Sequence, residues 1–153
     1  MKYITVAVMV VAIFFSCKKD KFTTAPQITY KSLTSNFVDA SDPTAVFPSV
    51  NFELTDAEGD VGYNDGKDTA WVYIKSLLTN DIDSAIFPVL SSATRKDFKV
   101  TVTASLEKAT KCRPVPGNAI HVDTIYYEIY VKDFAKNKSN VIKTGEPVLF
   151  RCQ

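Results

Sequence analysis

The stretch "LTDAEGDVGYNDG", from Leu54 to Gly66, contains the strongest candidate for chemistry in the sequence. It places Asp56, Glu58 and Asp60 at every second position, with glycines nearby. Calcium binds six to eight oxygen atoms, and alternate acidic residues in a flexible loop provide several of them. Two interpretations follow. The stretch is either part of a calcium site or a polar turn whose aspartates accept hydrogen bonds from the turn's own backbone amides.

The spacing of the acidic residues does not match an EF-hand. With Asp56 at the first position, the sixth residue is Val61 instead of glycine, and the twelfth is Lys67 instead of glutamate. Three carboxylates on one short segment leave a calcium shell incomplete, so a site also needs ligands from a second loop. The acidic residues that such a loop would contribute are Asp65, Asp68 or Asp133.

We therefore expect the turn, with residues 56–62 forming an exposed loop between two strands and holding no metal or other cofactor. The calcium interpretation stays open, and it requires a specific geometry. The acidic side chains that would have to converge are Asp56, Glu58, Asp60 and Asp133.

Residues that would form a catalytic centre are sparse. His121 is the only histidine, and no Gly-x-Ser-x-Gly motif accompanies it. The segment "GYNDGKD" resembles a phosphate-binding loop only superficially, since too few residues separate Gly62 from Gly66. Asp68 also stands where that loop has the Ser or Thr that binds magnesium. We expect a protein that is not an enzyme.

Aromatic residues offer a binding surface instead. Trp71 and Tyr73 share one face of a predicted strand, and Tyr126 and Tyr130 share one face of another. Exposed on a sheet, such rings stack on sugars or contact a protein. Equally, they pack inside the fold if both faces of the strand are buried. Both interpretations remain open.

Period-two alternation of apolar and polar residues predicts the strands that position these groups. The clearest inward-facing rows are Val50, Phe52 and Leu54, and then Ile125, Tyr127, Ile129 and Val131. Turn residues separate the runs, and a short helical turn is expected only within residues 80–90, before Pro88. About seven strands without βαβ alternation indicate an all-β fold, a single antiparallel sandwich of the immunoglobulin-like type.

The first 16 residues are typical of a secretory signal peptide, because Lys2 precedes a nearly apolar run from Ile4 to Phe15. As a helix this run would rise about 18 Å, which is less than the roughly 30 Å hydrocarbon core of a bilayer. It ends in "IFFSC", which resembles a bacterial lipobox. The resemblance implies cleavage after Ser16 and attachment of acyl chains to Cys17.

The lipobox resemblance divides the chain into a signal peptide (1–16), a lipidated cysteine with a flexible tether (17–26) and the sandwich domain (27–153). It implies an outer-membrane protein whose first partner is the lipid bilayer, facing the periplasm or the cell surface. Cleavage removes one of 18 basic residues and leaves 17 beside 17 acidic ones. A neutral chain gives no reason to expect nucleic acid as a partner.

Two cysteines remain once Cys17 is assigned to the anchor, namely Cys112 and Cys152. A lone pair of thiols in an oxidising compartment usually forms a disulfide, which we expect here. Two free buried thiols are the alternative. A metal site is disfavoured because no histidine lies at ligand spacing from either cysteine.

The segments "VNFELTDAEGDVG" and "YYEIYVKDFAKNKSNVIKT" together resemble those of small bacterial lipoproteins with an immunoglobulin-like domain. Those proteins carry a D-x-[DE]-G-D-x-G loop after an early strand, and near the end a strand, an Asp, a short turn and a last strand. The matching positions are Asp56, Glu58, Gly59, Asp60 and Gly62, then Asp133, Asn137, Ser139 and Asn140. The resemblance implies a fold and a cellular location more than an activity.

We expect a membrane-anchored lipoprotein that acts as a non-catalytic binding or structural module at the cell envelope. Its further partner would be a glycan or an envelope protein. Two alternatives remain: a glycan-binding accessory subunit of a nutrient-uptake system, which would use the aromatic residues, and a calcium-dependent adhesion module, which would use the acidic ones.

Overall fold

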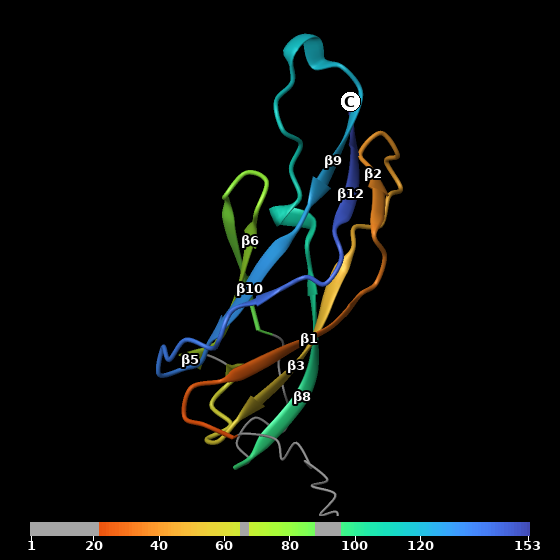
Figure 1. Cartoon of the computed structure of the whole chain (residues 1–153). Coiled ribbons are helices and arrows are strands. Elements are labelled where there is room, and N and C mark those ends of the chain that lie inside the picture. Colours follow the sequence, from red (N-terminus) through yellow and green to blue (C-terminus); the bar gives the residue numbers. More distant parts are fainter. Residues whose placement is uncertain (1–21, 65–67, 88–95) are drawn as a thin grey trace, which may run out of the picture.

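The computed structural model describes residues 22–64, 68–87 and 96–153 (Figure 1). The expected signal peptide and Cys17 lie outside these residues, as do Asp65, Lys67 and residues 18–21 of the expected tether. Within them the chain is all-β and sandwich-like, which confirms the predicted fold class. The described chain begins near the lower end of Figure 1 and ends at the top, where the C-terminus lies.

Twelve strands and two short 3₁₀ helices occur among the described residues, so the expected number of about seven strands is too low. In chain order the strands are β1 (Gln27–Leu33), β2 (Phe37–Asp39), β3 (Ser49–Asp56), β4 (Tyr63–Asn64), β5 (Asp68–Thr69), β6 (Trp71–Ser76), β7 (Ile82–Ile86), β8 (Phe98–Ser105), β9 (His121–Ile125), β10 (Tyr127–Lys132), β11 (Ile142–Lys143) and β12 (Val148–Cys152). The helices are η1 (Glu107–Ala109) and η2 (Pro116–Asn118), both between β8 and β9.

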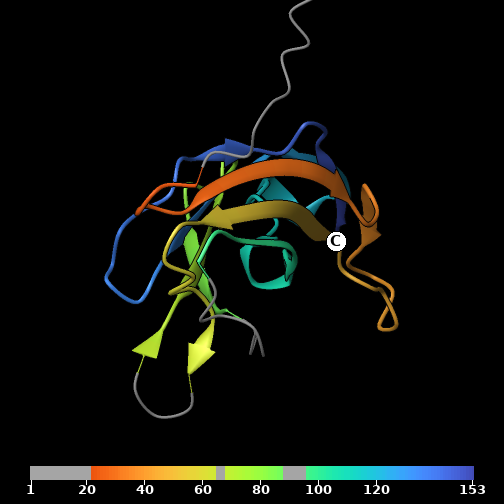
Figure 2. The ribbon, with the colours of Figure 1, turned by 90° about the horizontal axis from the view of Figure 1, so that it is seen from below.

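The strands form three sheets and one two-stranded ribbon. In the first sheet β3 lies between β1 and β8; in the second the order is β11-β10-β6-β7; in the third β12 lies between β2 and β9. The β4–β5 ribbon extends away from the sheets (Figure 2). Among these pairs only β2–β12 is parallel, so the expected purely antiparallel arrangement is wrong there. No hairpin joins β2 to β12, and partners so distant in the chain are free to pair in either direction.

Two of the predicted strands are each divided into two. The run "DTIYYEIYVKD" breaks at Tyr126, because β9 before it pairs with β12 whereas β10 after it pairs with β6. The last run breaks at the predicted bend near Gly145 and Pro147, which separates β11 from β12. These two divisions add two strands to the predicted number; the other additional strands are β2, β4, β5 and β7, which no predicted run contains.

The helical turn expected before Pro88 is wrong for residues 80–87, the described part of that segment, where the chain forms β7. The connection from β6 to β7 is closed by a 2.9 Å hydrogen bond from the Ser76 N–H to the Asp81 carbonyl. Asn80 adopts a φ of 62° in this turn, a conformation that asparagine tolerates better than most residues. Pairing with β6, and not local periodicity, therefore defines this strand.

One hydrophobic core connects the sheets, and the predicted inward-facing rows contribute to it. The row of β3 is Val50, Phe52 and Leu54, and the row of β10 is Tyr127, Ile129 and Val131; all are 0% exposed. Burying one such side chain stabilises the fold by roughly 1.5–3 kcal/mol. The Tyr127 hydroxyl is paired with Thr110 Oγ1 at 2.7 Å, so its burial leaves no polar atom without a partner.

Asn140 links the first two sheets at the open edge of β1. Its Oδ1 accepts a hydrogen bond from the Ile28 N–H at 2.7 Å, and its Nδ2 donates to the Ile28 carbonyl at 2.8 Å. The side-chain amide thus takes the place of a neighbouring strand for one residue. Such an arrangement also blocks the edge from pairing with another chain at that point.

The predicted disulfide between Cys112 and Cys152 is confirmed, with 5.8 Å between the two Cα atoms. It ties the long connection between β8 and β9, which extends to the top of Figure 1, to the end of β12. The two cysteines are 40 residues apart. Closing a loop of that length stabilises a fold mainly by restricting the unfolded chain.

Removing the disulfide is expected to lower the free energy of unfolding by about 4 kcal/mol, the loop-entropy value for this separation. The measurement is urea denaturation of the oxidised protein beside the Cys112→Ala/Cys152→Ala double variant. Reductant serves as the control, because it should destabilise the wild type and leave the variant unchanged. Equal stability of the oxidised protein and the variant would contradict this prediction.

Candidate functional site

The central strands of the first two sheets both lead into a buried aspartate. Asp56 continues the inward-facing row of β3 two residues after Leu54, and it is 0% exposed. Asp133 directly follows β10, two residues after Val131, and it is also 0% exposed. Since successive side chains of a strand point to opposite faces, both carboxylates stand at positions that belong to the core.

Asp60 joins these two aspartates from the loop after β3. One carboxylate oxygen from each of Asp56, Asp60 and Asp133 lies within 4.8 Å of the other two, and we call these residues the carboxylate cluster. The loops that carry Asp60 and Asp133 are joined by a 3.0 Å hydrogen bond from the Phe134 N–H to the Asp60 carbonyl. The structure therefore brings together three of the four acidic residues that a calcium site required.

Backbone and amide donors hold part of the carboxylate cluster in place. The N–H groups of Gly59 and Asp60 donate to Asp56 Oδ2 at 2.5 and 3.2 Å. Asn137 donates its N–H to Asp133 Oδ1 at 2.7 Å and its Nδ2 to Asp133 Oδ2 at 2.8 Å. Two buried oxygen atoms, Asp56 Oδ1 and Asp60 Oδ1, have no hydrogen-bond partner.

The turn interpretation holds for the backbone, because Asp56 accepts from its own loop and Gly59 and Gly62 take positive φ angles of 69° and 126°. The expectation of an exposed loop is wrong: Asp56, Gly59, Val61 and Gly62 are buried, Ala57 and Asp60 are half-buried, and only Glu58 is exposed.

Glu58 is accordingly not part of the carboxylate cluster, which corrects its place among the four expected ligands. Alternate residues share a face only while the chain is extended, and the turn at Gly59 ends that regularity after Asp56. Of the other acidic residues considered, Asp65 and the side chain of Asp68 lie outside the described residues.

Negative charge accumulates in the carboxylate cluster. Burial, followed by the neighbouring charge of Asp60, raises the pKa of Asp56 to about 7. The pKa of Asp60 is also raised, first by burial and then by the charge of Asp133. None of the ion pairs between described residues includes these three carboxylates. Such a site is suited to hold either a bound cation or a shared proton.

The predicted binding aromatics occupy the outer face of the second sheet. Trp71, Tyr73, Tyr126 and Tyr130 are all half-buried. Tyr73 and Tyr130 lie opposite each other in the β6–β10 register and stack, with ring centroids 4.7 Å apart and planes within 7°. Both earlier interpretations thus hold in part, since the rings face outward and are partly covered by one another.

Lysine side chains cover these rings further. The ammonium groups of Lys132 and Lys138 lie 5.3 and 4.1 Å from the ring centroids of Tyr73 and Tyr130. Lys143 lies 4.3 Å from the ring centroid of Tyr126. Because cations and the stacked partner already occupy ring faces, the tyrosine pair has little surface on which a sugar could stack.

Strand β7 adds exposed apolar residues to the same face. Ile86 lies opposite Trp71, and Ile82 lies opposite Lys75. Ile82 and Ile86 are 58% and 55% exposed, although β7 is the outermost described strand of its sheet. We call Trp71, Ile82 and Ile86 the apolar edge patch; sequence reasoning missed it because β7 itself was not predicted.

A second group of potential ligands surrounds the disulfide. The β9–β12 register places Cys152 opposite His121, and His121 Nε2 lies 3.2 Å from Asp123 Oδ2. His121 and Asp123 are two residues apart in the sequence, but only the cross-strand register brings Cys152 to them, and linear spacing gave no sign of that. The Cys152 sulfur is bonded to Cys112 and offers no thiolate, and the Arg113 N–H donates to Asp123 at 2.8 Å. This group is structural.

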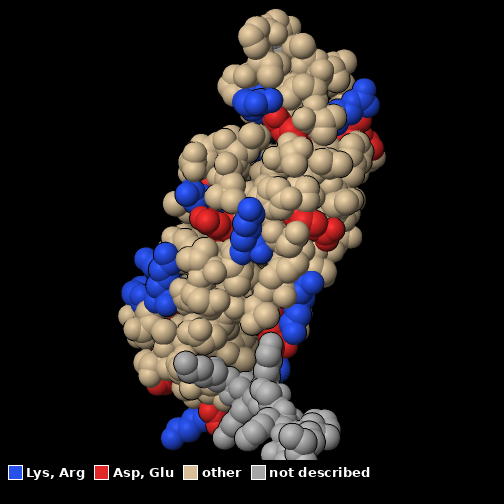
Figure 3. Space-filling model, viewed as in Figure 1, with Lys and Arg blue, Asp and Glu red and all other residues tan. Residues whose placement is uncertain are grey.

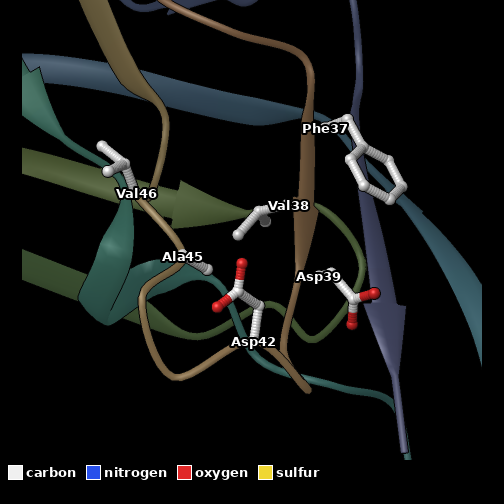
Figure 4. Close-up of a pocket in the computed structure, with 6 residues that line it drawn as sticks. All are labelled: Phe37, Val38, Asp39, Asp42, Ala45 and Val46. Carbon is white, nitrogen blue, oxygen red and sulfur yellow. The ribbon is translucent and has the colours of Figure 1, made fainter.

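A shallow hollow lies between β2 and the segment that follows it. It encloses 190 Å³ and is lined by Phe37, Val38, Asp39, Asp42, Ala45 and Val46. Val38, Asp42 and Ala45 point into it, whereas Phe37 and Asp39 point away (Figure 4). Its volume falls below the roughly 300–1,000 Å³ of small-molecule sites, so it is a poor candidate for a binding pocket.

Comparisons with protein-family models, with curated proteins and with solved structures return no match for this chain. In the described ranges, 22–64, 68–87 and 96–153, no helix is both long enough and apolar enough to span a bilayer.

The raised pKa of Asp56 predicts how stability depends on pH in the presence of a chelator. The folded state holds the proton more tightly than an ordinary carboxyl with a pKa of 3.8, so this contribution to stability is complete below pH 4. It is lost as the pH rises from about 4 to 7, by up to about 1.4 kcal/mol per pH unit.

Asp56→Asn is expected to remove this part of the pH dependence, because it keeps an oxygen for the Gly59 N–H but cannot ionise. The measurement is the free energy of unfolding in urea from pH 4 to pH 8, with chelator throughout. Glu58→Gln, on the exposed part of the loop, is the matched control and should follow the wild type. The same slope in Asp56→Asn and the wild type would refute the prediction.

Proposed function

We propose that this chain is a lipid-anchored protein of the bacterial cell envelope whose immunoglobulin-like domain is a non-catalytic module that binds an envelope protein. The observation that carries the binding role is the apolar edge patch. Two isoleucines that are more than half exposed, one of them opposite a tryptophan on the outer face of a sheet, are typical of a protein contact. The anchor is proposed from the "IFFSC" segment that ends in Cys17.

A protein fits this face better than a glycan does. Sugar binding depends on open aromatic ring faces, and the Tyr73–Tyr130 stack with its lysines leaves few of them. Basic and acidic side chains are also interspersed over the visible side of the molecule (Figure 3). A surface on which basic and acidic side chains are mixed does not favour the binding of a highly charged polymer. The near-neutral net charge of the chain agrees with this.

The position of the first described residues supports a close attachment to the membrane. The Thr23 carbonyl accepts a 3.1 Å hydrogen bond from the Ala57 N–H, so the chain joins the domain at the loop that carries Asp60 of the carboxylate cluster. A chain from Cys17 to Thr23 spans at most about 20 Å. In this proposal the carboxylate cluster faces the membrane and the disulfide end points away from it.

Cys17→Ser tests the anchor. The wild type should sediment with membranes, enter the detergent phase and incorporate labelled palmitate, whereas the variant should do none of these. Stable anchoring needs two or more acyl chains, because a single chain binds only reversibly. Recovery of the wild type in the soluble fraction with an intact Met1 would refute the anchor.

Cross-linking tests the binding face. A photoreactive residue replacing Ser84, which lies on β7 between the two isoleucines, should yield one discrete protein adduct in intact cells. Ile82→Asp/Ile86→Asp should abolish the adduct. The matched control places the photoreactive residue at Val46, an apolar residue that is 85% exposed elsewhere on the domain. Adducts of equal yield from both positions would refute a specific contact.

Retention on an envelope polysaccharide that Trp71→Ala abolishes would instead establish the glycan alternative.

A further inference from the structure

We propose that the carboxylate cluster is a calcium site in which Asp56, Asp60 and Asp133 are the protein ligands. This inference is independent of the anchor and of the apolar edge patch. It starts from Asp56, a fully buried side chain whose Oδ1 has no hydrogen-bond partner although its Oδ2 has two. A buried polar atom left without a partner is costly, and in a native fold it calls for an explanation.

A bound cation explains the unpartnered oxygens of both Asp56 and Asp60. Asp60 Oδ1 is also buried without a partner, and one oxygen of each of the three carboxylates falls within the same 4.8 Å. Oxygen atoms of this number and charge suit a hard divalent cation. Each carboxylate keeps lone pairs for the ion, and the half-buried Asp60 leaves room for water to complete the shell.

The remaining contacts resemble the outer shell of a metal site. Carboxylates that bind a metal are normally oriented by further hydrogen bonds. Here the Gly59 N–H fixes Asp56, and Asn137 fixes both oxygens of Asp133. A proton shared between Asp56 and Asp60 would involve only those two side chains, whereas the carboxylate cluster includes a third carboxylate, that of Asp133, which directly follows β10 of the second sheet.

Calcium is favoured over magnesium by the geometry. Magnesium requires a nearly ideal octahedron at short distance, whereas calcium accepts an irregular set of oxygens. The cluster combines two strand ends with a loop, and only its strand ends are fully buried. Such a loop-dependent site corresponds to the weak calcium sites of extracellular modules, with a dissociation constant of about 10⁻⁴ to 10⁻³ M.

The site would join segments that are distant in the chain. The Ala57 N–H is bonded to Thr23, and the Ala57 carbonyl accepts from the Asp97 N–H at 3.0 Å. Phe134 connects the same loop to the end of β10. Calcium binding is therefore expected to stabilise the end of the domain at which the chain enters it.

Thermal unfolding with chelator or with millimolar calcium tests the proposal. At ten times the dissociation constant, calcium should raise the Tm of the wild type by about 5 °C, and calorimetric titration should give one ion per chain. Asp60→Asn should bind no calcium and show no rise. Glu58→Gln is the matched control, since it removes one acidic charge from the same loop outside the cluster, and it should respond as the wild type does.

A further comparison separates ligand loss from misfolding. In chelator, Asp60→Asn should be at least as stable as the wild type, because it removes one of three mutually repelling charges. A fold-damaging substitution would lower the Tm under both conditions. No calcium response in the wild type, an equal response in Asp60→Asn, or a larger response to magnesium than to calcium would each overturn the proposal.

Discussion

The structure depends on one constraint, which is that the central strands β3 and β10 must each bury one face in a common core. Every second residue of both strands is therefore withdrawn from water. This alternation applies to every inward-facing position along β3 and β10, including the last one. Asp56 is the last residue of β3 and Asp133 directly follows β10, so the same alternation that builds the core also places two carboxylates at its end. The candidate metal centre is thus a direct product of the packing.

Burial and repulsion make the carboxylate cluster unfavourable for the fold on its own. Three charges share a small volume, and donors from Gly59, Asp60 and Asn137 offset only part of the desolvation. The rigid strands hold the charges together despite this repulsion. Functional groups positioned by a packed core are held more accurately than groups on free loops. The apolar edge patch differs, because its two isoleucines lie on β7, the outermost described strand of the sheet, whose only strand partner among the described residues is β6.

Local patterns in the sequence predict much of this structure, and pairing between distant segments accounts for the rest. Alternation identifies the rows of β3 and β10, and two cysteines in a chain that is expected to be exported predict their bond. Extending each row by one step would also have predicted the burial of Asp56 and Asp133. The break at Tyr126, the parallel β2–β12 pair and the Tyr73–Tyr130 stack depend on which strands become neighbours. No local periodicity contains that information.

The central place of β12 in its sheet has a consequence for the order of folding. Residues 37–39 of β2 pair with residues 149–151, and the antiparallel partner of β12 is β9. Strand β2 therefore cannot pair with β12 until the ribosome has synthesised more than a hundred further residues. Contacts of such long range slow folding. A chain with this topology stays incompletely folded throughout its synthesis. A polypeptide in that state is still able to pass through a narrow channel.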